Sequence, residues 1–191
     1  MKTFHLLSKT FTLVAFLALY SNSFAQEFVW APDFPVGAEL PAVTAPDQHG
    51  NMQTLEELQG DKGMVLLISR SYEWCPYCIR QLGQLIDVAP QLKSMGINVA
   101  TLTYDPVSIL TESALDHEAS FPMLSDAPNY DNVKALGILN AQYSPGERPY
   151  GIAYPGIFLL DANGVIKAKF AEEDYRERPE FALVLEAAEQ L

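Results

Sequence analysis

The sequence predicts an α/β domain in which strands and helices alternate. The first sign is a short, continuous apolar run, Met64 to Ser69, which is typical of a buried strand. The second is the helical spacing of apolar residues that follows Cys75 and ends at Gly96, a residue suited to a C-terminal cap. Another strand pattern, Ile97 to Tyr104, comes directly afterwards. This succession of strand, helix and strand is typical of α/β proteins.

The rest of the chain continues the alternation. Residues 43–45 and 52–54 flank the turn signal Asp47-Gln48-His49-Gly50, which predicts a small hairpin. Residues 157–160 and 165–170 flank Asp161-Ala162-Asn163-Gly164, which predicts a second hairpin with Gly164 at positive φ. The other expected elements are helices at 107–119 and 132–139, an extended segment at 121–124, and a closing helix after Pro179 with Phe181, Val184, Leu185 and Ala188 on one face.

The first 25 residues have the pattern of a secretory signal peptide. Two lysines, Lys2 and Lys9, precede an apolar stretch from Phe11 to Tyr20, and the small residues Ser23 and Ala25 suit a signal peptidase. The apolar stretch is about half of the roughly 20 residues that a membrane-spanning helix needs. We therefore expect cleavage after Ala25 and export to the periplasm of a bacterium, with no membrane attachment afterwards.

The expected mature chain is one acidic globular domain. The full sequence has 12 basic and 24 acidic residues, and removing two lysines with the signal peptide leaves 10 against 24, a net charge of −14. This charge argues against a nucleic acid or an anionic membrane as partner. We expect an irregular N-terminal arm at residues 26–35 and a single domain at residues 36–191.

The chain has two cysteines, which lie three positions apart in Trp74-Cys75-Pro76-Tyr77-Cys78. The motif follows the expected strand and opens the expected helix. There the free N–H groups and the helix dipole stabilise a thiolate at Cys75. Pro76 suits a first helical position because its missing N–H costs nothing there. Cys78 then lies one turn along on the same face, within reach of Cys75 for a reversible disulfide.

Two other uses of the cysteines are less consistent with the sequence. A zinc site needs four ligands, and beyond the cysteines the expected mature chain offers only His49 and His117, at no finger-like spacing. A purely structural disulfide across so short a loop restrains little of the unfolded chain. Redox chemistry remains, with no metal and no other cofactor expected.

The motifs together resemble those of the thioredoxin superfamily. The resemblance covers roughly residues 36 to 190. It is carried by the Trp74 to Cys78 motif after a core strand, by Tyr154-Pro155 shortly before Phe158, and by the hairpin from Phe158 to Gly164. More narrowly, the chain resembles the redoxin branch, which includes the alkyl hydroperoxide reductase and thiol-specific antioxidant proteins and exported thioredoxin-like oxidoreductases. The resemblance implies a thioredoxin-like fold, a central mixed β-sheet flanked by helices. It also implies that Pro155 is cis and faces the cysteines.

Two redox mechanisms are open, and we favour the first. In a thiol–disulfide oxidoreductase, Cys75 forms a mixed disulfide with a partner and Cys78 resolves it. In a peroxiredoxin, Cys75 attacks a peroxide and Cys78 condenses with the sulfenic acid. Peroxiredoxins usually carry Thr or Ser three residues before the reactive cysteine and Pro seven before, where this chain has Tyr72 and Ile68. A third possibility is a non-catalytic member that only binds a partner, against which the retention of both cysteines argues.

Several residues near the motif are candidates for substrate contact. Trp74 and Tyr77 are expected to form an apolar rim with Pro76, while Pro155, with Tyr154, shapes the groove for an extended partner chain. The expected partners are protein thiols or disulfides and an upstream electron donor, with hydroperoxides in the second mechanism. Arg80 is a candidate to support the thiolate, and Arg148 is the nearest candidate for a peroxidase's activating arginine. We further expect Cys75 to be the more exposed thiol with the lower pKa.

Overall fold

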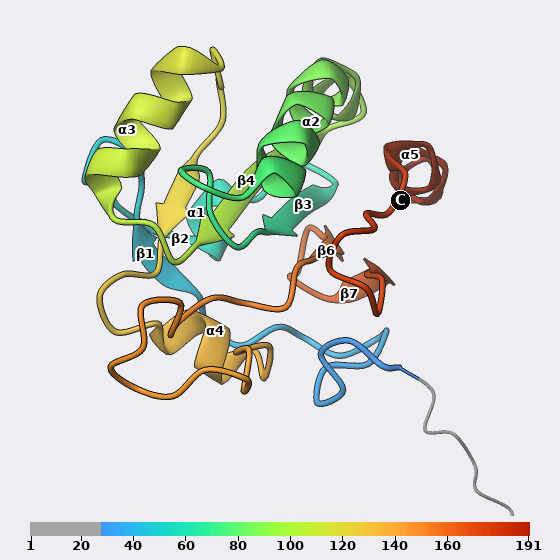
Figure 1. Ribbon diagram of the computed structural model, residues 1–191. Coiled ribbons are helices and arrows are strands. Elements are labelled where there is room, and N and C mark those ends of the chain that lie inside the picture. Colours follow the sequence, from blue (N-terminus) through green and yellow to red (C-terminus); the bar gives the residue numbers. More distant parts are fainter. Residues whose placement is uncertain (1–27) are drawn as a thin grey trace, which may run out of the picture.

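The computed structural model describes residues 28–191, so the expected signal peptide and the first two residues of the arm lie outside the described part. Figure 1 shows its helices and strands. In chain order they are β1 (Thr44–Pro46), β2 (Met52–Thr54), α1 (Leu55–Leu58), β3 (Gly63–Ile68), α2 (Pro76–Ser94), β4 (Ile97–Thr103), α3 (Val107–Asp116), β5 (Met123–Ser125), α4 (Asp131–Ala135), β6 (Gly156–Asp161), β7 (Ile166–Phe170) and α5 (Phe181–Ala188).

Five strands form one mixed sheet in the order β5-β4-β3-β6-β7. The central strand β3 pairs parallel with β4 and antiparallel with β6. At the edges, β5 runs parallel to β4 and β7 runs antiparallel to β6. The hairpin of β1 and β2 is a separate two-stranded sheet. The central mixed sheet with flanking helices confirms the predicted α/β class and both predicted hairpins.

The sheet has two different faces, because side chains alternate along each strand. From β3, Met64, Leu66 and Ile68 enter one apolar cluster, which the N-terminal arm, α1 and α4 cover. We call this side the arm face. Val65 and Leu67 enter the other cluster, which contains both cysteines and is covered by α2, α3 and α5. We call this side the dithiol face. In Figure 1 the arm face lies below the sheet and the dithiol face above it.

The arm is fixed to the sheet through Trp30. Its indole ring packs on Phe158 with the ring centroids 4.4 Å apart, and its Nε1 donates a hydrogen bond of 3.0 Å to the carbonyl of Tyr154. A Cβ atom added at Gly156 would lie 2.6 Å from the Trp30 ring, so glycine is required at this close approach. The arm therefore contributes to the core directly before β6.

The local differences from the sequence-based expectations involve short elements. Helix α1 has only four residues, too few for a periodic pattern, but Thr54 and Glu57 form a reciprocal capping box at its start. Helix α4 ends at Ala135, earlier than expected, because Gly137 at φ +65° turns the chain toward an isolated bridge between Leu139 and Ala153. The fifth strand is shifted slightly from the expected extended segment.

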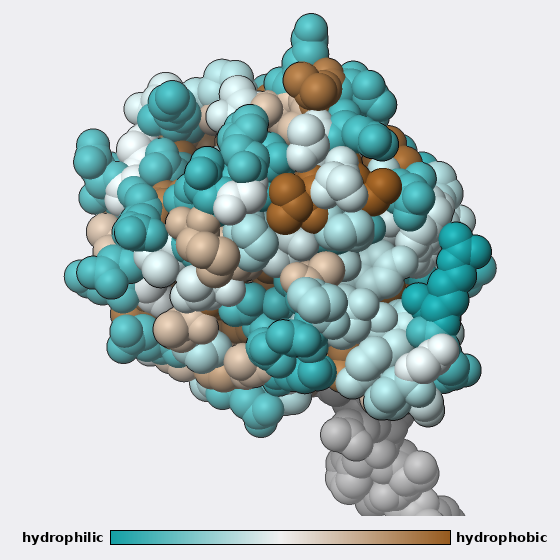
Figure 2. Space-filling model, turned by 90° about the vertical axis from the view of Figure 1, so that its left-hand side faces the viewer, coloured by the Kyte–Doolittle hydropathy of each residue, from teal (hydrophilic) through white to brown (hydrophobic). Residues whose placement is uncertain are grey.

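The described helices are all too short or too polar to cross a membrane. Figure 2 shows the side of the molecule that lies at the left in Figure 1, where α3 and the β1–β2 hairpin are found. Hydrophobic residues appear there as separate spots among hydrophilic ones. Scattered apolar residues of this kind are ordinary for a protein surface, and this side offers no broad apolar docking patch.

Candidate functional site

The two cysteines lie at the junction between β3 and α2, as predicted. Cys75 is the N-cap of α2 and Pro76 occupies its first turn. Cys75 and Cys78 are joined by a disulfide, with their Cα atoms 5.3 Å apart. The backbone N–H of Cys78 lies 3.3 Å from the Cys75 Sγ atom and donates to it. The first turn of the helix thus directs an N–H group at Cys75, which favours negative charge on that sulfur when the disulfide is reduced.

The loop before Cys75 is held by a buried carboxylate at the end of β4. Asp105 Oδ2 accepts hydrogen bonds from the backbone N–H of Tyr72, at 2.7 Å, and from Thr103 Oγ1, at 3.1 Å. Burial raises the pKa of Asp105 in spite of these bonds. Ser71 Oγ accepts from the backbone N–H of Glu73, at 3.1 Å, which fixes the next peptide. The position of Cys75 is therefore set by β4 as well as by its own helix.

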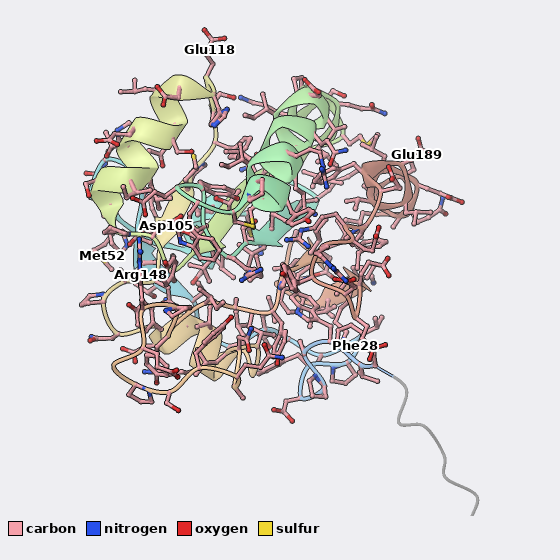
Figure 3. The ribbon with its side chains drawn as sticks, viewed as in Figure 1. Phe28, Met52, Asp105, Glu118, Arg148 and Glu189 are labelled. Atoms are coloured by element: carbon pink, nitrogen blue, oxygen red, sulfur yellow. A yellow bond between two sulfur atoms is a disulfide. The ribbon has the colours of Figure 1, made fainter. Side chains whose placement is uncertain are left out.

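Trp74 forms one wall of a pocket next to the disulfide. Trp74 is 37% exposed, and its Nε1 donates to the Tyr104 hydroxyl at 2.8 Å. The pocket has a volume of about 310 Å³ and is lined by Arg70, Trp74, Tyr104, Tyr143, Arg148 and Pro149. Figure 3 labels Arg148 and Asp105, and Tyr104, the residue before Asp105, lines the pocket with Arg148. The loop that contains Arg148, expected to lead only toward Pro155, is thus part of the surroundings of Trp74.

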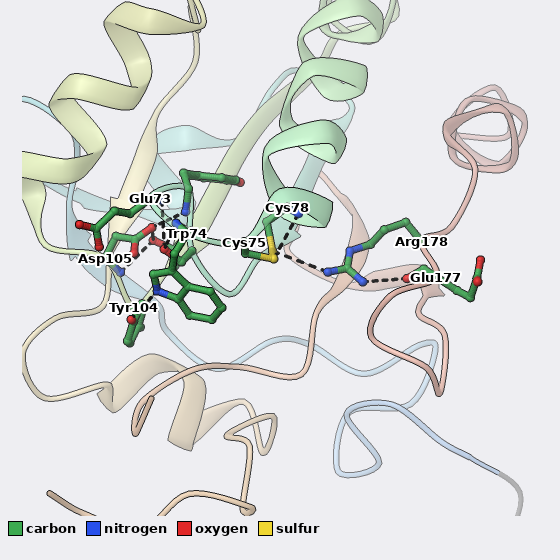
Figure 4. The surroundings of a disulfide bond; sticks show 11 residues. Glu73, Trp74, Cys75, Cys78, Tyr104, Asp105, Glu177 and Arg178 are labelled. Carbon is green, nitrogen blue, oxygen red and sulfur yellow. Dashed lines mark hydrogen bonds between the residues drawn. A yellow bond between two sulfur atoms is a disulfide. The ribbon is translucent and has the colours of Figure 1, made fainter. Parts of the chain in front are cut away.

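From outside the motif, Arg178 contacts the disulfide, a residue that the sequence analysis does not identify. Its Nη2 atom lies 3.6 Å from Cys78 Sγ and donates to it. Figure 4 shows the disulfide between Trp74 on one side and Arg178 on the other. Burial, followed by the charges of Arg70 and Arg80, lowers the pKa of Arg178 to about 10. Arg178 lies 100 positions from Cys78 along the chain, so no local pattern links the two.

Tyr77 and Tyr175 extend the rim of the site. Their rings meet edge to face with the centroids 6.2 Å apart. The Arg80 guanidinium lies 5.4 Å above the Tyr77 ring, and the Arg70 guanidinium lies 4.3 Å above the Tyr175 ring. The expected rim of Trp74, Pro76 and Tyr77 is therefore brought together around the disulfide, with arginines against its aromatic rings.

Neither arginine that we named as a candidate reaches a sulfur atom. Arg80 contacts the Tyr77 ring, and Arg148 lines the pocket behind Trp74. Tyr72, which replaces the usual Thr or Ser of peroxiredoxins, is buried, and burial raises the pKa of its hydroxyl to about 12. That hydroxyl lies beside the hydroxyls of Ser69 and Thr101, but the geometry of a hydrogen bond is not met in the described chain. Among residues 28–191, the hydrogen bond to Cys75 Sγ comes from the backbone of Cys78 and from no side chain.

One expectation about the site is wrong in this structure: the bond before Pro155 is not cis. Among the described residues the cis peptide bond is Ala127–Pro128, and Tyr154–Pro155 is trans. Here the Tyr154 N–H donates to the Ile138 carbonyl at 2.8 Å, and the Tyr154 carbonyl accepts from Trp30 Nε1. Both backbone groups of Tyr154 therefore have hydrogen-bond partners while the bond to Pro155 keeps the usual trans form. Tyr154 packs with the cluster of the arm face, whereas the cysteines belong to the opposite cluster.

Both cysteines are buried in the disulfide form, with Cys75 1% and Cys78 0% exposed. That Cys75 is the more exposed thiol after reduction stays a prediction. The side chain of Arg178 against Cys78 and the Trp74 ring beside Cys75 flank the pair (Figure 4). The disulfide form is therefore covered on both sides.

Comparison with known proteins agrees with this geometry. The family model of the AhpC/TSA family matches residues 36–169. The chain is 31% identical over 138 residues to alkyl hydroperoxide reductase E of Mycobacterium tuberculosis, covering 72% of this chain and 84% of the relative. It is 25% identical over 163 residues to the thiol-disulfide oxidoreductase ResA of Bacillus cereus, covering 85% and 82% of the two chains.

A solved structure supports the fold. The peroxidoxin BcpB of Mycobacterium tuberculosis superposes with a TM-score of 0.72 at 19% identity, over 83% of this chain and 98% of the other. Together, the Cys75–Cys78 disulfide at a strand-to-helix junction, the family match and these relatives show that the chain is a redoxin-type oxidoreductase that belongs to the AhpC/TSA family.

Proposed function

We propose that the protein is an exported thiol–disulfide oxidoreductase that acts through Cys75 and Cys78. The observation that carries the proposal is the position of Cys75 as the N-cap of α2, bonded to a second cysteine within the same turn. The helix terminus stabilises the attacking thiolate, and the short spacing supplies an immediate resolving thiol. The two sulfurs therefore suffice for a complete exchange cycle.

The cycle balances with protein disulfides as the oxidant. The Cys75 thiolate attacks a partner disulfide, which forms a Cys75 mixed disulfide and releases one partner thiolate. The Cys78 thiolate then attacks Cys75 Sγ, which forms the Cys75–Cys78 disulfide and releases the second. The protein dithiol is oxidised and the partner disulfide is reduced by two electrons. The reverse sequence oxidises partner thiols, and an electron donor of the dithiol class returns the protein to its reduced form.

Access to the sulfurs requires a local movement. Because both cysteines are covered in the disulfide form, an incoming sulfur reaches Cys75 after a side chain of the rim is displaced. Trp74, half exposed and held by one hydrogen bond to Tyr104, and Arg178, held near Cys78, are the groups that flank the bond. The partner then contacts the rim of Trp74, Pro76 and Tyr77.

A thiol peroxidase is the second candidate function. It is supported by the names of several relatives, which include alkyl hydroperoxide reductase E and peroxiredoxin Bcp. The site itself supports it less. No side-chain hydroxyl or guanidinium in the described chain donates to Cys75 Sγ, and the arginine that reaches a sulfur contacts Cys78 instead. Stabilising a peroxide at Cys75 would require donors directed at that atom.

The substitution Cys78→Ser separates the two mechanisms. If Cys75 exchanges with disulfides, the variant cannot resolve its mixed disulfides, and covalent adducts with partner proteins accumulate on non-reducing gels. If Cys75 is peroxidatic, the same variant collects a sulfenic acid after peroxide, which a dimedone-type reagent labels. We expect adducts and slow peroxide consumption. Rapid peroxide consumption by the wild type, lost in Cys75→Ser, without adducts in Cys78→Ser, would reverse the ranking.

Export to the periplasm is part of the proposal and has a separate test. The lysine-led apolar segment and the small residues Ser23 and Ala25 support it. Intact-mass analysis of the exported protein is expected to show a chain that begins at Gln26. A mature protein that retains Lys2 would contradict export by cleavage without affecting the redox assignment.

A further inference from the structure

The described chain places its positive charge unevenly. The sequence contains five arginines, Arg70, Arg80, Arg148, Arg176 and Arg178, in a chain with 24 acidic residues. Four of them contact the disulfide or the aromatic side chains beside it, and Arg176 follows the rim residue Tyr175. Described lysines contact other parts of the molecule: Lys134 pairs with Asp131 in α4, Lys167 pairs with Asp161, and Lys169 donates to the arm.

Four of the arginines have a defined contact at the site. Arg178 donates to Cys78 Sγ, and Arg80 lies over the Tyr77 ring. The Arg70 guanidinium lies 5.1 Å from the Trp74 ring centre and 4.3 Å from that of Tyr175. Arg148 lines the pocket together with Arg70 and Trp74. Arg176 follows Tyr175 and forms an ion pair of 2.6 Å with Asp174.

Four of these charges lack an acidic partner. Within residues 28–191, no carboxylate oxygen lies within 4.0 Å of the guanidinium groups of Arg70, Arg80, Arg148 or Arg178. Arg70 is only 9% exposed, and its Nε atom has no hydrogen-bond partner in the protein. Glu73 is exposed beside Trp74 but forms no such pair. Buried charges are ordinarily paired, so this arrangement leaves guanidinium groups available to an external anion.

The pocket behind Trp74 matches an anion attached to an organic chain. Arg70 and Arg148 supply guanidinium donors suited to a carboxylate, and Trp74, Tyr104 and Tyr143 supply flat apolar surface for the atoms that carry it. Its volume of about 310 Å³ is at the lower end of small-molecule sites, enough for one or two residues of a peptide. The pocket is adjacent in sequence and space to Cys75, because Trp74 is its wall.

We propose that the preferred substrates are disulfides that carry carboxylates beside the reacting sulfur, and that Arg70 and Arg148 bind those carboxylates. This inference rests on the proposed thiol–disulfide exchange and specifies its substrate class. The rest of the strongly acidic chain repels such substrates, and a local group of unpaired arginines offsets that repulsion where the reaction occurs. The shared chemistry is a carboxylate next to sulfur, whether on a small organic thiol or in an acidic peptide segment.

The test compares three small disulfides of similar size and different charge. These are 3,3′-dithiodipropionate, which is anionic, 2-hydroxyethyl disulfide, which is neutral, and cystamine, which is cationic. Full-length purified protein is reduced, freed of reductant and mixed with each compound. Oxidation of the dithiol is followed by thiol alkylation and mass analysis. Each rate is divided by the rate of the same compound with dithiothreitol, which removes differences in intrinsic reactivity.

At low ionic strength, the corrected rate is expected to be highest with the anionic disulfide, lower with the neutral one and lowest with the cationic one. We call the corrected rate with the anionic disulfide divided by that with the neutral one the anionic-to-neutral ratio. In Arg148→Gln this ratio is expected to be roughly five- to tenfold lower than in the wild type, within the range of electrostatic effects on association. Arg148→Lys, which keeps the charge, should retain most of the ratio. Arg148 is exposed, so these changes spare the core.

Lys93→Gln is the matched control for loss of one positive charge. Lys93 is exposed on the last turn of α2, roughly 27 Å from Cys75 at 1.5 Å per residue, so its charge acts much more weakly on the site than a charge in the pocket. It should leave the ratio unchanged. Moderate salt should reduce the ratio in the wild type and have less effect in Arg148→Gln.

Two failures have different meanings. Equal corrected rates for all three disulfides, or an unchanged ratio in Arg148→Gln, would overturn the carboxylate preference while leaving thiol–disulfide exchange intact. Failure of every disulfide to oxidise the dithiol would overturn the proposed function and this inference with it. A pair of peptide disulfides, identical except for Glu or Gln beside the cysteine, then identifies the source: a larger ratio than for the small compounds indicates an acidic peptide, and an equal ratio indicates a small carboxylate thiol.

Discussion

The two faces of the sheet are built from the same strands but in different ways. On the arm face, Trp30 packs on Phe158 and donates its N–H to a carbonyl, within a cluster of apolar side chains. The dithiol face also has an apolar cluster, but polar residues on this face have buried side-chain oxygens or nitrogens without a hydrogen-bond partner in the protein. Residues with such atoms include Tyr72, Gln81, Thr101, Ser113 and Arg178.

This difference between the faces suggests that one mainly stabilises the fold and the other mainly serves the chemistry of the cysteines. A buried polar atom that lacks a hydrogen-bond partner costs about 1–3 kcal/mol of folding free energy, so the dithiol face contributes less to stability than the arm face. Departures from ordinary core packing are expected where a protein positions reactive groups. We infer that the arm face holds the fold together, whereas the dithiol face sets the environment of Cys75 and Cys78. Changes on the two faces should therefore differ in kind.

The largest effect is expected for Trp30→Ala. It removes a buried indole and its hydrogen bond to Tyr154, which is expected to lower the free energy of unfolding by about 3–5 kcal/mol. Urea denaturation measures the change, and the rate of dithiol oxidation per folded molecule should stay close to that of the wild type. Val29→Ala is the control, because Val29 is 57% exposed in the same arm. A loss below 1 kcal/mol would show that the arm is not part of the stabilising core.

Two buried aspartates offer the next comparison, one on each face. Asp126 accepts from Asn132 N and Nδ2 through Oδ1 and from Val133 N through Oδ2, which satisfies the first turn of α4. In Asp126→Asn the NH₂ group would replace one of these two accepting oxygens and face an N–H donor, so a hydrogen bond would be lost. We therefore expect the free energy of unfolding to fall by about 1–3 kcal/mol. Asp105 uses Oδ2 for both of its bonds, and an Asn oxygen can replace it. Asp105→Asn should therefore change stability much less at neutral pH.

Asp105 also predicts a pH dependence with a definite sign. Burial raises its pKa above the ordinary value of 3.8, so the folded protein binds more protons than the unfolded chain between that value and the raised pKa. Stability of the wild type should fall as pH rises through this window, and this contribution is absent in Asp105→Asn. Denaturation of both proteins from pH 4 to 8 measures the difference. If the stability of the wild type relative to Asp105→Asn instead rose with pH, the pKa of Asp105 would not be raised.

A smaller effect, on reactivity and not on folding, is expected for Arg178→Gln. The Arg178 guanidinium lies 3.6 Å from Cys78 Sγ and favours its thiolate. Measured in Cys75→Ser, where Cys78 is the single thiol, the change should raise the pKa of Cys78 by about one unit and slow alkylation about tenfold below that pKa. Arg176→Gln is the control, since Asp174 already pairs with Arg176. Equal alkylation profiles in both variants would remove Arg178 from the thiol's environment.

The smallest expected effect has the opposite sign. Tyr72→Phe removes a buried hydroxyl without a protein partner, so the free energy of unfolding should rise by about 1 kcal/mol. Tyr104→Phe is its counterpart, because the Tyr104 hydroxyl accepts from Trp74 Nε1 and its removal should be slightly destabilising. Thermal denaturation compares the two. Destabilisation by Tyr72→Phe would mean that the hydroxyl is bonded to its neighbours Ser69 and Thr101 in solution.

Much of the fold and the centre of the site could be predicted from local sequence patterns. The strand before Cys75, the helix after it and the turn at Gly164 depend on residues close to each other in the chain. The same is true of Pro76 in the first turn of α2 and of the rim residues Trp74 and Tyr77. Periodicity, capping and turn chemistry act over a few residues, so they are visible without a structure.

The surroundings of the sulfurs were not predictable in this way. Arg178 reaches Cys78 from 100 positions away, and Trp30 bonds to Tyr154 from 124 positions away. The family resemblance implied a cis bond before Pro155, whereas the structure has a trans bond there. The burial of both cysteines likewise depends on such contacts. Packing brings distant segments together according to the whole sheet and its helices, and hydrogen bonds and charges between them leave no periodic trace in the sequence. The dithiol can therefore be identified from the sequence, whereas its arginine environment forms only when the tertiary structure brings Arg148 and Arg178 to it.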